Sequence, residues 1–252
     1  MLNTIRLLFD GQQRKAKNAE NANKKLLHIL NTISWTNEDD LHLLLRKLGD
    51  LFKQGADPNL KDQFGNTMLT KINQNINKQV FTMFVKAGAD ANIPDQNGEY
   101  PLFQISTWPR LELLIEAGSD LNIKNLEGRT KLYTVFHNLS IGPHWKHQEE
   151  FIYILLKHGA DPNVLCENED GSGFDTPLSI LFKYLSPDSK YYIHVLNLVI
   201  RIIDEYNGVP LTINQYHQIR DKLNKKTQEK LDSAEKVSSN DKDFFYLASQ
   251  TI

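Results

Sequence analysis

The sequence has a single cysteine, Cys166, among its 252 residues. One thiol excludes an internal disulfide and offers no cysteine pair for a zinc site, and it favours a reducing compartment. Long hydrophobic runs are also lacking, because no stretch approaches the roughly 18 apolar residues of a membrane span. Near the N-terminus, Arg6 and Asp10 confine the apolar residues to a core too short for a signal peptide. We therefore expect a cytoplasmic protein with no membrane span.

An excess of charge of either sign is missing as well. The chain has 29 Lys and Arg against 31 Asp and Glu, which gives a net charge of -2. No overall positive field is present to collect phosphates along a nucleic acid, so we expect no nucleic-acid partner. A hydrophobic content of 40% is typical of a folded protein with a real core.

What the sequence does contain is an internal repeat. Four segments share an apolar start, a Gly followed by a small residue and Asp, and a final Asn: LFKQGADPN (51–59), FVKAGADAN (84–92), LIEAGSDLN (114–122) and LLKHGADPN (155–163). Their glycines, Gly55, Gly88, Gly118 and Gly159, are separated by 33, 30 and 41 residues. Repetition at such a period predicts a stack of similar units.

A second mark recurs in phase with the first. Thr67, Tyr100 and Thr130 each lie eight residues after the final Asn of a segment, and each follows a Gly by two positions. In the fourth unit the matching Thr176 comes five residues later, because residues 167–173 lengthen the intervening loop. The fourth unit therefore keeps the pattern and carries an insertion.

These two motifs resemble those of the ankyrin-repeat family, over about residues 53–184. The family's unit is a β-turn finger followed by two antiparallel helices, with a Thr-Pro-Leu-His start and a Gly-Ala-Asp end. The sequence departs from that pattern at Tyr100, which replaces Thr, and at Met68 and Lys131, which replace Pro. The resemblance implies an all-α fold: an ankyrin-repeat solenoid of stacked helix pairs with short β-turn fingers and extra capping helices at both ends.

Local chemistry agrees with this interpretation. A Gly at the end of each apolar segment supplies the left-handed conformation that terminates a helix. Thr176 before Pro177 is a sound helix start, since its hydroxyl can accept a backbone N–H and the proline needs no donor. Apolar residues three apart then predict a first helix in each unit, as with Leu102 and Ile105. A lone helix pair could not bury both of its apolar faces, so neighbouring units must stack.

We divide the chain into three parts. Residues 1–23 form an N-terminal helix or arm, and the basic run over 12–25 is interpreted as a solvated face, with an anionic docking site as the alternative. Residues 24–208 form the ankyrin-repeat domain of about five helix pairs, the outer ones degenerate. Residues 209–252 form a C-terminal capping helix, with an apolar stripe from Ile213 to Leu231, and a tail. The polar composition of 233–240 suggests fraying, while Phe244 to Tyr246 either dock back or form an exposed recognition tail.

The sequence contains no complete catalytic, metal-binding or phosphate-binding motif. His144 and His147 are the one close histidine pair, without the further ligands that zinc requires. The acidic residues 167–170 lack the ligand order of a calcium loop, and the glycines are explained by the repeats rather than by a phosphate loop. Cys166 is interpreted as a small buried residue. We expect no catalytic residue, cofactor or metal ion, and a protein that is not an enzyme.

The resemblance implies a protein-protein interaction scaffold that binds a partner protein on its finger and inner-helix face, as a monomer. Transferred to this sequence, the partner-binding positions are the finger tips and the inner ends of the first helices: Gln63, Phe64, Asn66, Gln96, Asn97, Glu99, Trp108, Leu126, Glu127, Arg129, His137 and Tyr184. Phe64, Trp108, Arg129 and Tyr184 are the preferred anchors, because aromatic residues and Arg dominate interface energetics. Phe64 and Trp108 equally fit a structural role within the repeats.

The abundance of Asn, Lys and Ile and the degenerate units also resemble ankyrin effectors of intracellular bacteria, which implies a eukaryotic host protein as partner and the host cytosol as location. Two other functions stay open. One is an ankyrin enzyme with a thiol site formed by Cys166 and the long excursion at 137–148, where Trp145 is either a packed lid or an exposed anchor. The other is a structural subunit of a homo-oligomer joined through the C-terminal stripe.

Overall fold

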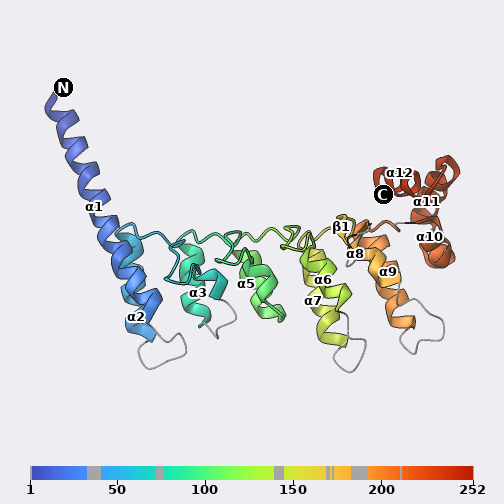
Figure 1. Cartoon of the computed structure of the whole chain (residues 1–252), viewed down its shortest axis with the longest axis horizontal. Coiled ribbons are helices and arrows are strands. Elements are labelled where there is room, and N and C mark those ends of the chain that lie inside the picture. Colours follow the sequence, from blue (N-terminus) through green and yellow to red (C-terminus); the bar gives the residue numbers. More distant parts are fainter. Residues whose placement is uncertain are drawn as a thin grey trace. The chain divides into compact units, whose positions relative to one another are not determined.

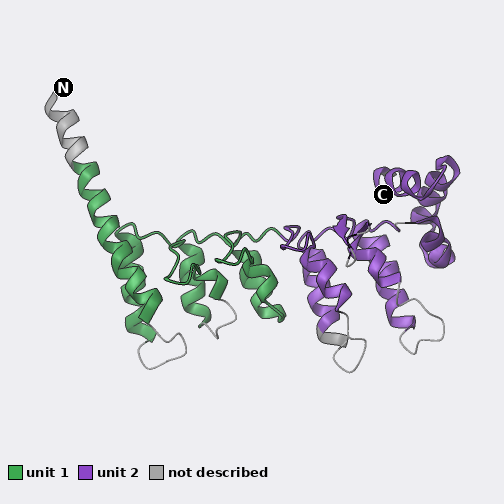
Figure 2. Ribbon diagram, viewed as in Figure 1, with its two compact units in different colours: residues 1–120 green, residues 121–252 purple. Residues whose placement is uncertain are grey.

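A computed structural model describes residues 2–32, 41–71, 77–138, 145–168, 171, 173–182, 192–210 and 212–251. The chain forms two compact units, Met1–Asp120 and Leu121–Ile252 (Figure 2). The described residues of both are mostly helical, with strands limited to one short pair, which confirms the predicted all-α class. The three-part division at residues 23 and 208 stays a prediction.

Unit 1 consists of short helices that follow one long helix (Figure 1). Its elements are α1 (Leu2–Thr32), α2 (Leu41–Lys53), the 3-10 turn η1 (Leu69–Lys71), α3 (Lys78–Lys86), α4 (Pro101–Gln104) and α5 (Trp108–Glu116). Helix α2 packs against α1 on one side and α3 on the other, and α3 packs in turn against α5. Of the alternatives expected for the N-terminus, helix or arm, residues 2–23 form a helix, which is the first part of α1 and is continuous with the segment that packs on α2.

The core of unit 1 joins these helices through their apolar faces. In α1, Leu26 and Leu30 lie one turn apart and are buried, and Leu48 of α2 is fully buried. Between α2 and α3, the rings of Phe52 and Phe84 meet edge to face with centroids 5.1 Å apart. An edge-to-face pair adds stabilisation beyond the area that it buries. Apolar side chains at helical spacing are therefore the contacts that hold neighbouring helices of unit 1 together.

Unit 2 begins with the same kind of helix pair and ends with a separate group of helices. Its elements are α6 (Lys131–His137), α7 (Trp145–Lys157), β1 (Cys166–Glu167), β2 (Phe174–Asp175), α8 (Pro177–Phe182), α9 (Tyr192–Tyr206), α10 (Ile213–Ile219), η2 (Arg220–Lys222), α11 (Lys225–Val237) and α12 (Asp241–Thr251). Helix α6 packs against α7 and α8, and α8 packs against α9. Strands β1 and β2 pair antiparallel at the base of the inserted loop.

The asparagine that ends each repeated segment links it to the next segment. In unit 1, Asn59 Nδ2 donates to the carbonyl of Gly88 at 3.4 Å, and its Oδ1 accepts the N–H of Asp90 at 2.7 Å. Asn92 makes the same two bonds with the carbonyl of Gly118 and the N–H of Asp120, at 3.0 and 2.7 Å. A side-chain amide satisfies one carbonyl and one N–H at once, so each link uses both halves of the group.

The same link recurs within unit 2 and extends past the four segments seen in the sequence. Asn122 bonds the carbonyl of Gly159 at 3.0 Å, in the segment that follows it. Asn163 bonds the carbonyl of Asn207 at 2.8 Å and the N–H of Val209 at 2.7 Å. Asn207 has a φ of 53°, the conformation that the glycines hold in the other segments. Residues 207–209 therefore take the place of a fifth Gly-containing segment.

The first helix of the second repeat is shorter than the apolar spacing predicts. This helix is α4, which ends at Gln104. Ile105 is buried but extended, with φ −95° and ψ 146°, so the prediction that it continues the helical face of Leu102 is wrong. This unit is three residues short, and the chain must leave α4 early to begin α5 at Trp108 and Pro109.

The C-terminal region forms three helices where the sequence suggested one helix and a frayed tail. Asn224 interrupts the expected helix, because its side chain accepts the N–H of Thr227 and starts α11. Helix α11 continues to Val237, and α12 follows. Phe244 is fully buried with its ring centroid 5.7 Å from that of Tyr216, so this residue docks back, whereas Tyr246 is 65% exposed.

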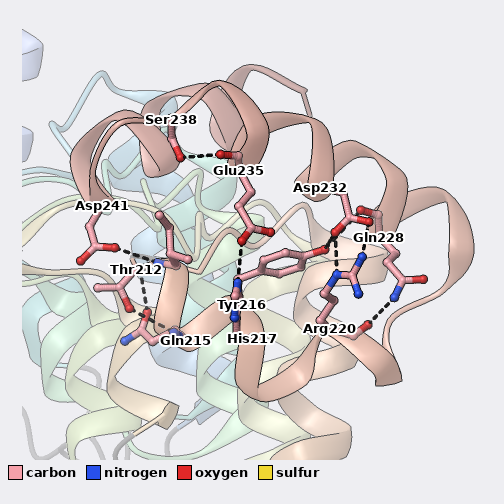
Figure 3. Close-up of polar contacts among 11 residues, drawn as sticks. Thr212, Gln215, Tyr216, His217, Arg220, Gln228, Asp232, Glu235, Ser238 and Asp241 are labelled. Atoms are coloured by element: carbon pink, nitrogen blue, oxygen red, sulfur yellow. Dashed lines mark hydrogen bonds and ion pairs between the residues drawn. The ribbon is translucent and has the colours of Figure 1, made fainter.

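Polar contacts tie α10 to α11 (Figure 3). Arg220 donates twice to the Asp232 carboxylate, at 2.7 and 2.6 Å, and the Tyr216 hydroxyl bonds the same carboxylate. His217 and Glu235 make a second link, with Nε2 and Oε1 2.6 Å apart. The hydrogen bonds from Arg220 are the main reason that the pKa of Asp232 falls to about 2. These contacts hold α10 and η2 against α11.

The excursion expected at residues 137–148 is shorter than predicted. Helix α6 ends at His137, and α7 begins at Trp145, so residues 145–148 belong to a helix. Whether Trp145 is a lid or an anchor stays open, since its side chain is outside the described part. Of the described helices, not one is both long and apolar enough to cross a membrane.

Candidate partner-binding surface

Each finger is a tight turn held by the side chain of its first residue. In unit 1, Asp62 Oδ1 accepts the N–H groups of Phe64 and Asn66, both at 2.9 Å. Asp95 Oδ1 holds the next finger through Asn97 and Glu99, at 2.8 and 3.0 Å. A carboxylate that accepts two backbone N–H groups fixes the turn without using the side chains at its tip.

The second oxygen of each carboxylate binds a residue nine positions later. Asp62 Oδ2 lies 2.6 Å from Lys71 Nζ, with the two side chains 1% and 9% exposed. Lys71 also donates to the carbonyl of Leu30 in α1, at 3.1 Å. In the second finger, Gln104 Nε2 donates to Asp95 Oδ2 at 3.2 Å. The fingers of unit 1 are thereby attached to the first helical turn of their own repeats.

Burial and hydrogen bonding act in opposite directions on the pKa of Asp62. Burial raises this pKa, but the hydrogen bonds from Lys71, Asn66 and Phe64 together outweigh it and leave the pKa below its ordinary value. Asp62 is therefore ionised at neutral pH, and its charge is compensated within the fold.

The two fingers of unit 1 lie side by side. Lys61 Nζ donates to the carbonyl of Pro94 at 2.9 Å. A Cβ added at Gly65, where φ is 73°, would lie 2.7 Å from the Cβ of Gln96. Only glycine permits both the conformation and the close approach. The structure thus brings together the six predicted positions Gln63, Phe64, Asn66, Gln96, Asn97 and Glu99.

The tip side chains differ in how far they reach solvent. Gln63, Gln96 and Asn97 are exposed, whereas Asn66 and Glu99 are half-buried. Phe64 is 57% exposed although it is a large apolar residue. An exposed aromatic ring on a turn that its neighbours hold rigid is a feature of interaction surfaces.

In unit 2 the third finger borders a small hollow. Asn125 Oδ1 accepts the N–H groups of Glu127 and Arg129, at 3.1 and 3.0 Å. The hollow beside it has a volume of about 250 Å³ and is lined by Glu127, Arg129, Tyr133, Thr134, His137 and Asn138. It brings together the predicted residues Glu127, Arg129 and His137. Leu126, at the tip, is 71% exposed.

The Arg129 side chain makes several contacts within the protein, which leave little of it accessible as an interface anchor. Its side chain is 15% exposed and pairs with Glu127 at 2.9 Å. It also donates from Nε to the carbonyl of Glu167 at 3.2 Å and lies 5.6 Å from the ring centroid of Tyr133. Arg129 therefore shapes the wall of the hollow, and Glu127, 63% exposed, offers the accessible charge.

Two predicted anchors are not joined to these groups. Trp108 begins α5 and is 41% exposed, but no described contact links it to the finger tips. Tyr184 is outside the described residues. The role of Tyr184 in binding stays a prediction.

Cys166 lies in β1 and is fully buried. Burial raises the pKa of its thiol, and hydrogen bonding with Thr130 opposes this only in part. A raised pKa reduces the thiolate that nucleophilic chemistry requires. Within the described ranges, no three His, Cys, Asp or Glu side chains gather closely enough to hold a metal ion.

The sequence interpretation missed Tyr133, Thr134 and Asn138 as lining residues, and Lys71 and Gln104 as supports. A usable signal was present for the supports, because a carboxylate and a long donor nine residues apart occur in both fingers of unit 1. For Tyr133 the signal was its spacing of four from His137, which places the two rings together with centroids 6.3 Å apart.

No family model matches the chain.

Proposed function

We propose that the chain is an ankyrin-repeat solenoid that acts as a scaffold for protein-protein interaction. The partner protein binds on the finger tips and on the adjoining ends of the first helices. The observation that carries this proposal is a division of roles within each finger: backbone groups and the Asp62, Asp95 and Asn125 side chains hold the turn, while the tip side chains project from it.

A fixed frame lowers the cost of binding. Side chains that are already positioned lose less freedom when a partner docks, so more of the contact free energy appears as affinity. In unit 1, Phe64 supplies apolar area at a finger tip, and Gln96 and Asn97 supply exposed polar groups on the neighbouring finger; in unit 2, Leu126 is an exposed apolar tip. An apolar centre surrounded by polar groups is the usual arrangement of an interface.

The hollow of unit 2 offers a place of its own for one partner side chain. Its walls carry the carboxylate of Glu127 and the hydroxyl of Thr134, and Arg129 is held against Tyr133. A volume of about 250 Å³ is small for a separate ligand, since small-molecule sites usually span several hundred Å³. It fits a polar anchor residue of a bound protein.

The test is affinity capture with two matched double variants of the full chain. Phe64→Ser with Leu126→Ser removes the exposed apolar tips of two fingers. Val237→Ser with Tyr246→Ser removes two residues of the C-terminal helices that are equally exposed, at 73% and 65%. We expect the finger variant to capture at least about tenfold less partner than the wild type, because a few anchor residues carry most of the binding free energy. The C-terminal variant should capture nearly as much as the wild type.

Thermal unfolding of both variants should match the wild type, since exposed residues contribute little to the core. Equal capture by wild type and finger variant would contradict the proposed surface. Loss of capture in the C-terminal variant alone would move the site to α11 and α12.

A further inference from the structure

Unit 1 carries two grooves between its helices, away from the finger tips. The larger has a volume of about 540 Å³ and is lined by α1, α2 and the residue just after α2: Lys24, Lys25, His28, Ile29, Lys47, Asp50, Leu51 and Gln54. The smaller, of about 390 Å³, lies between α2 and α3 and is lined by Leu45, Lys78, Gln79, Thr82, Met83 and Lys86. Helix α2 thus contributes to both.

The larger groove has an apolar floor and a basic rim. Leu51 is buried and Ile29 is half-buried, whereas Lys24, Lys25 and Lys47 are exposed. Lysines of this kind lay their methylene stems along apolar surface and keep the ammonium group in water. Asp50 is the one acidic residue among those that line this groove. The rim therefore carries positive charge from both helices.

The smaller groove repeats this pattern. Its lining residues include Lys78 and Lys86, and none of them is acidic. Leu45 and Met83 supply apolar surface between the two lysines. With the larger groove, five lysines and one aspartate line the two hollows beside α2, although the whole chain has slightly more acidic than basic residues. Positive charge is thus concentrated where apolar surface is accessible.

We propose that the groove between α1 and α2 is a second docking site, which takes an amphipathic helix of a partner protein with an apolar stripe and acidic flanks. The stripe covers Ile29 and Leu51, and carboxylates on either flank face Lys25 and Lys47. Helix-in-groove binding uses this arrangement of apolar anchors and flanking charge. Charge complementarity selects the acidic occupant, because a basic helix would meet lysines on both sides.

This site is separate from the finger surface. Its lining residues belong to α1 and α2 or follow α2 directly, and none is a finger-tip residue. Variants at Phe64 or Leu126 should therefore leave binding in the groove unchanged. An anionic membrane is the rival for the same charge, but a flat surface would reach the rim lysines without filling a groove.

The test uses synthetic peptides with the full-length protein. The probe is a helical peptide of about 20 residues, long enough for about 30 Å of helix, with leucines at i, i+3, i+4 and i+7 and glutamates on the flanks. A second peptide has lysines in place of the glutamates. Fluorescence anisotropy should show the acidic peptide binding at least about tenfold more tightly, with affinity falling as salt is added.

The decisive variant is Lys25→Glu with Lys47→Glu, which reverses one rim charge on each helix. Lys24 is left intact because it pairs with Glu20 at 2.7 Å. The matched control is Lys222→Glu with Lys226→Glu, two exposed lysines of η2 and α11, which changes the net charge equally. We expect about a tenfold loss of acidic-peptide affinity in the rim variant and less than about twofold in the control.

A floor variant, Ile29→Ser, tests the apolar part and should also weaken the peptide, with helicity checked by circular dichroism. Equal affinity for the two peptides, or unchanged binding by the rim variant, would overturn the proposal. Rim-dependent binding to phosphatidylserine vesicles without binding of the acidic peptide would also overturn it, in favour of a membrane surface.

Discussion

The two fingers of unit 1 have the same turn but different supports. In both, one aspartate oxygen accepts two backbone N–H groups and the other meets a side chain nine residues later. In the first finger that side chain is Lys71, and the pair is almost fully buried. In the second it is Gln104, which gives a hydrogen bond to a half-buried aspartate. The same turn is thus supported by a buried ion pair in the first finger and by a hydrogen bond from a neutral amide to the charged Asp95 in the second.

The third finger, in unit 2, indicates what the support does. Its first residue is Asn125, whose amide has one acceptor oxygen, and that oxygen is already used by the turn. The residue nine positions later is Thr134, whose hydroxyl donates to the carbonyl of Lys131 instead. Thr134 also lines the hollow beside this finger. A short residue at this position leaves space where the other two fingers have a long donor.

The largest effect is expected from Lys71→Met. The variant leaves Asp62 buried without its cation, and an unpaired buried charge costs several kcal/mol. We expect the free energy of unfolding to fall by about 3 kcal/mol, measured by urea denaturation followed by circular dichroism. Lys53→Met, at an exposed position of α2, is the control and should change it by less than about 0.5 kcal/mol. Similar losses in both variants would contradict the assigned role of the pair.

Lowering the pH should reduce the difference between wild type and Lys71→Met. The folded-state pKa of Asp62 is lowered in the wild type, so its contribution is present above the unfolded-state pKa of about 4 and is lost as pH falls below it. In the variant, burial has less opposition and raises the Asp62 pKa, so protonation relieves the buried charge. Urea denaturation at pH 7, 5 and 3.5 measures this trend. A difference that stays constant over these pH values would mean that the loss is not electrostatic.

The repeat was predictable because its marks are local. A glycine with positive φ and an asparagine four residues later occur in every segment, and each does the same job wherever it stands. The links between segments confirm the register within each unit. What the sequence did not reveal was Asn207 in the place of a glycine, since a non-glycine residue with φ of 53° gives no signal in a search for Gly. Recognising it requires the bond from Asn163.

The C-terminal helices were harder to predict for a physical reason. The apolar stripe from Ile213 to Leu231 keeps a helical spacing across the break, because Tyr216 of α10 packs on Phe244 of α12 and α11 also packs against α12. Apolar periodicity alone therefore predicts one continuous helix across residues 223 and 224, where the structure has a turn. The side chains of Asn224 and Asn240 cap the two helix starts, a signal that the sequence interpretation did not use.

For the candidate surface, the sequence predicted which residues lie at the finger tips but not which residues hold the fingers in place. The finger tips follow directly from the turn motif, whereas Tyr133 and Thr134 depend on which way α6 faces, which the family resemblance gives only in outline. Arg129 shows the limit most clearly. Its residue type marks it as an anchor, yet the structure uses it to bind Glu127 and the carbonyl of Glu167.

The smallest effect in the comparison is expected from Gln104→Leu. This change removes one hydrogen bond to Asp95 but leaves the carboxylate half-buried, where water can replace the amide. We expect a loss of about 1 kcal/mol in the free energy of unfolding, the usual contribution of a hydrogen bond, and no change in its pH dependence comparable to that of Lys71→Met. Gln79→Leu, at an exposed position of α3, is the matched control. A loss as large as that of Lys71→Met would show that the second finger depends on Gln104 as strongly as the first depends on Lys71. Burial of the Asp62–Lys71 pair would then not explain a difference in stability between the two fingers.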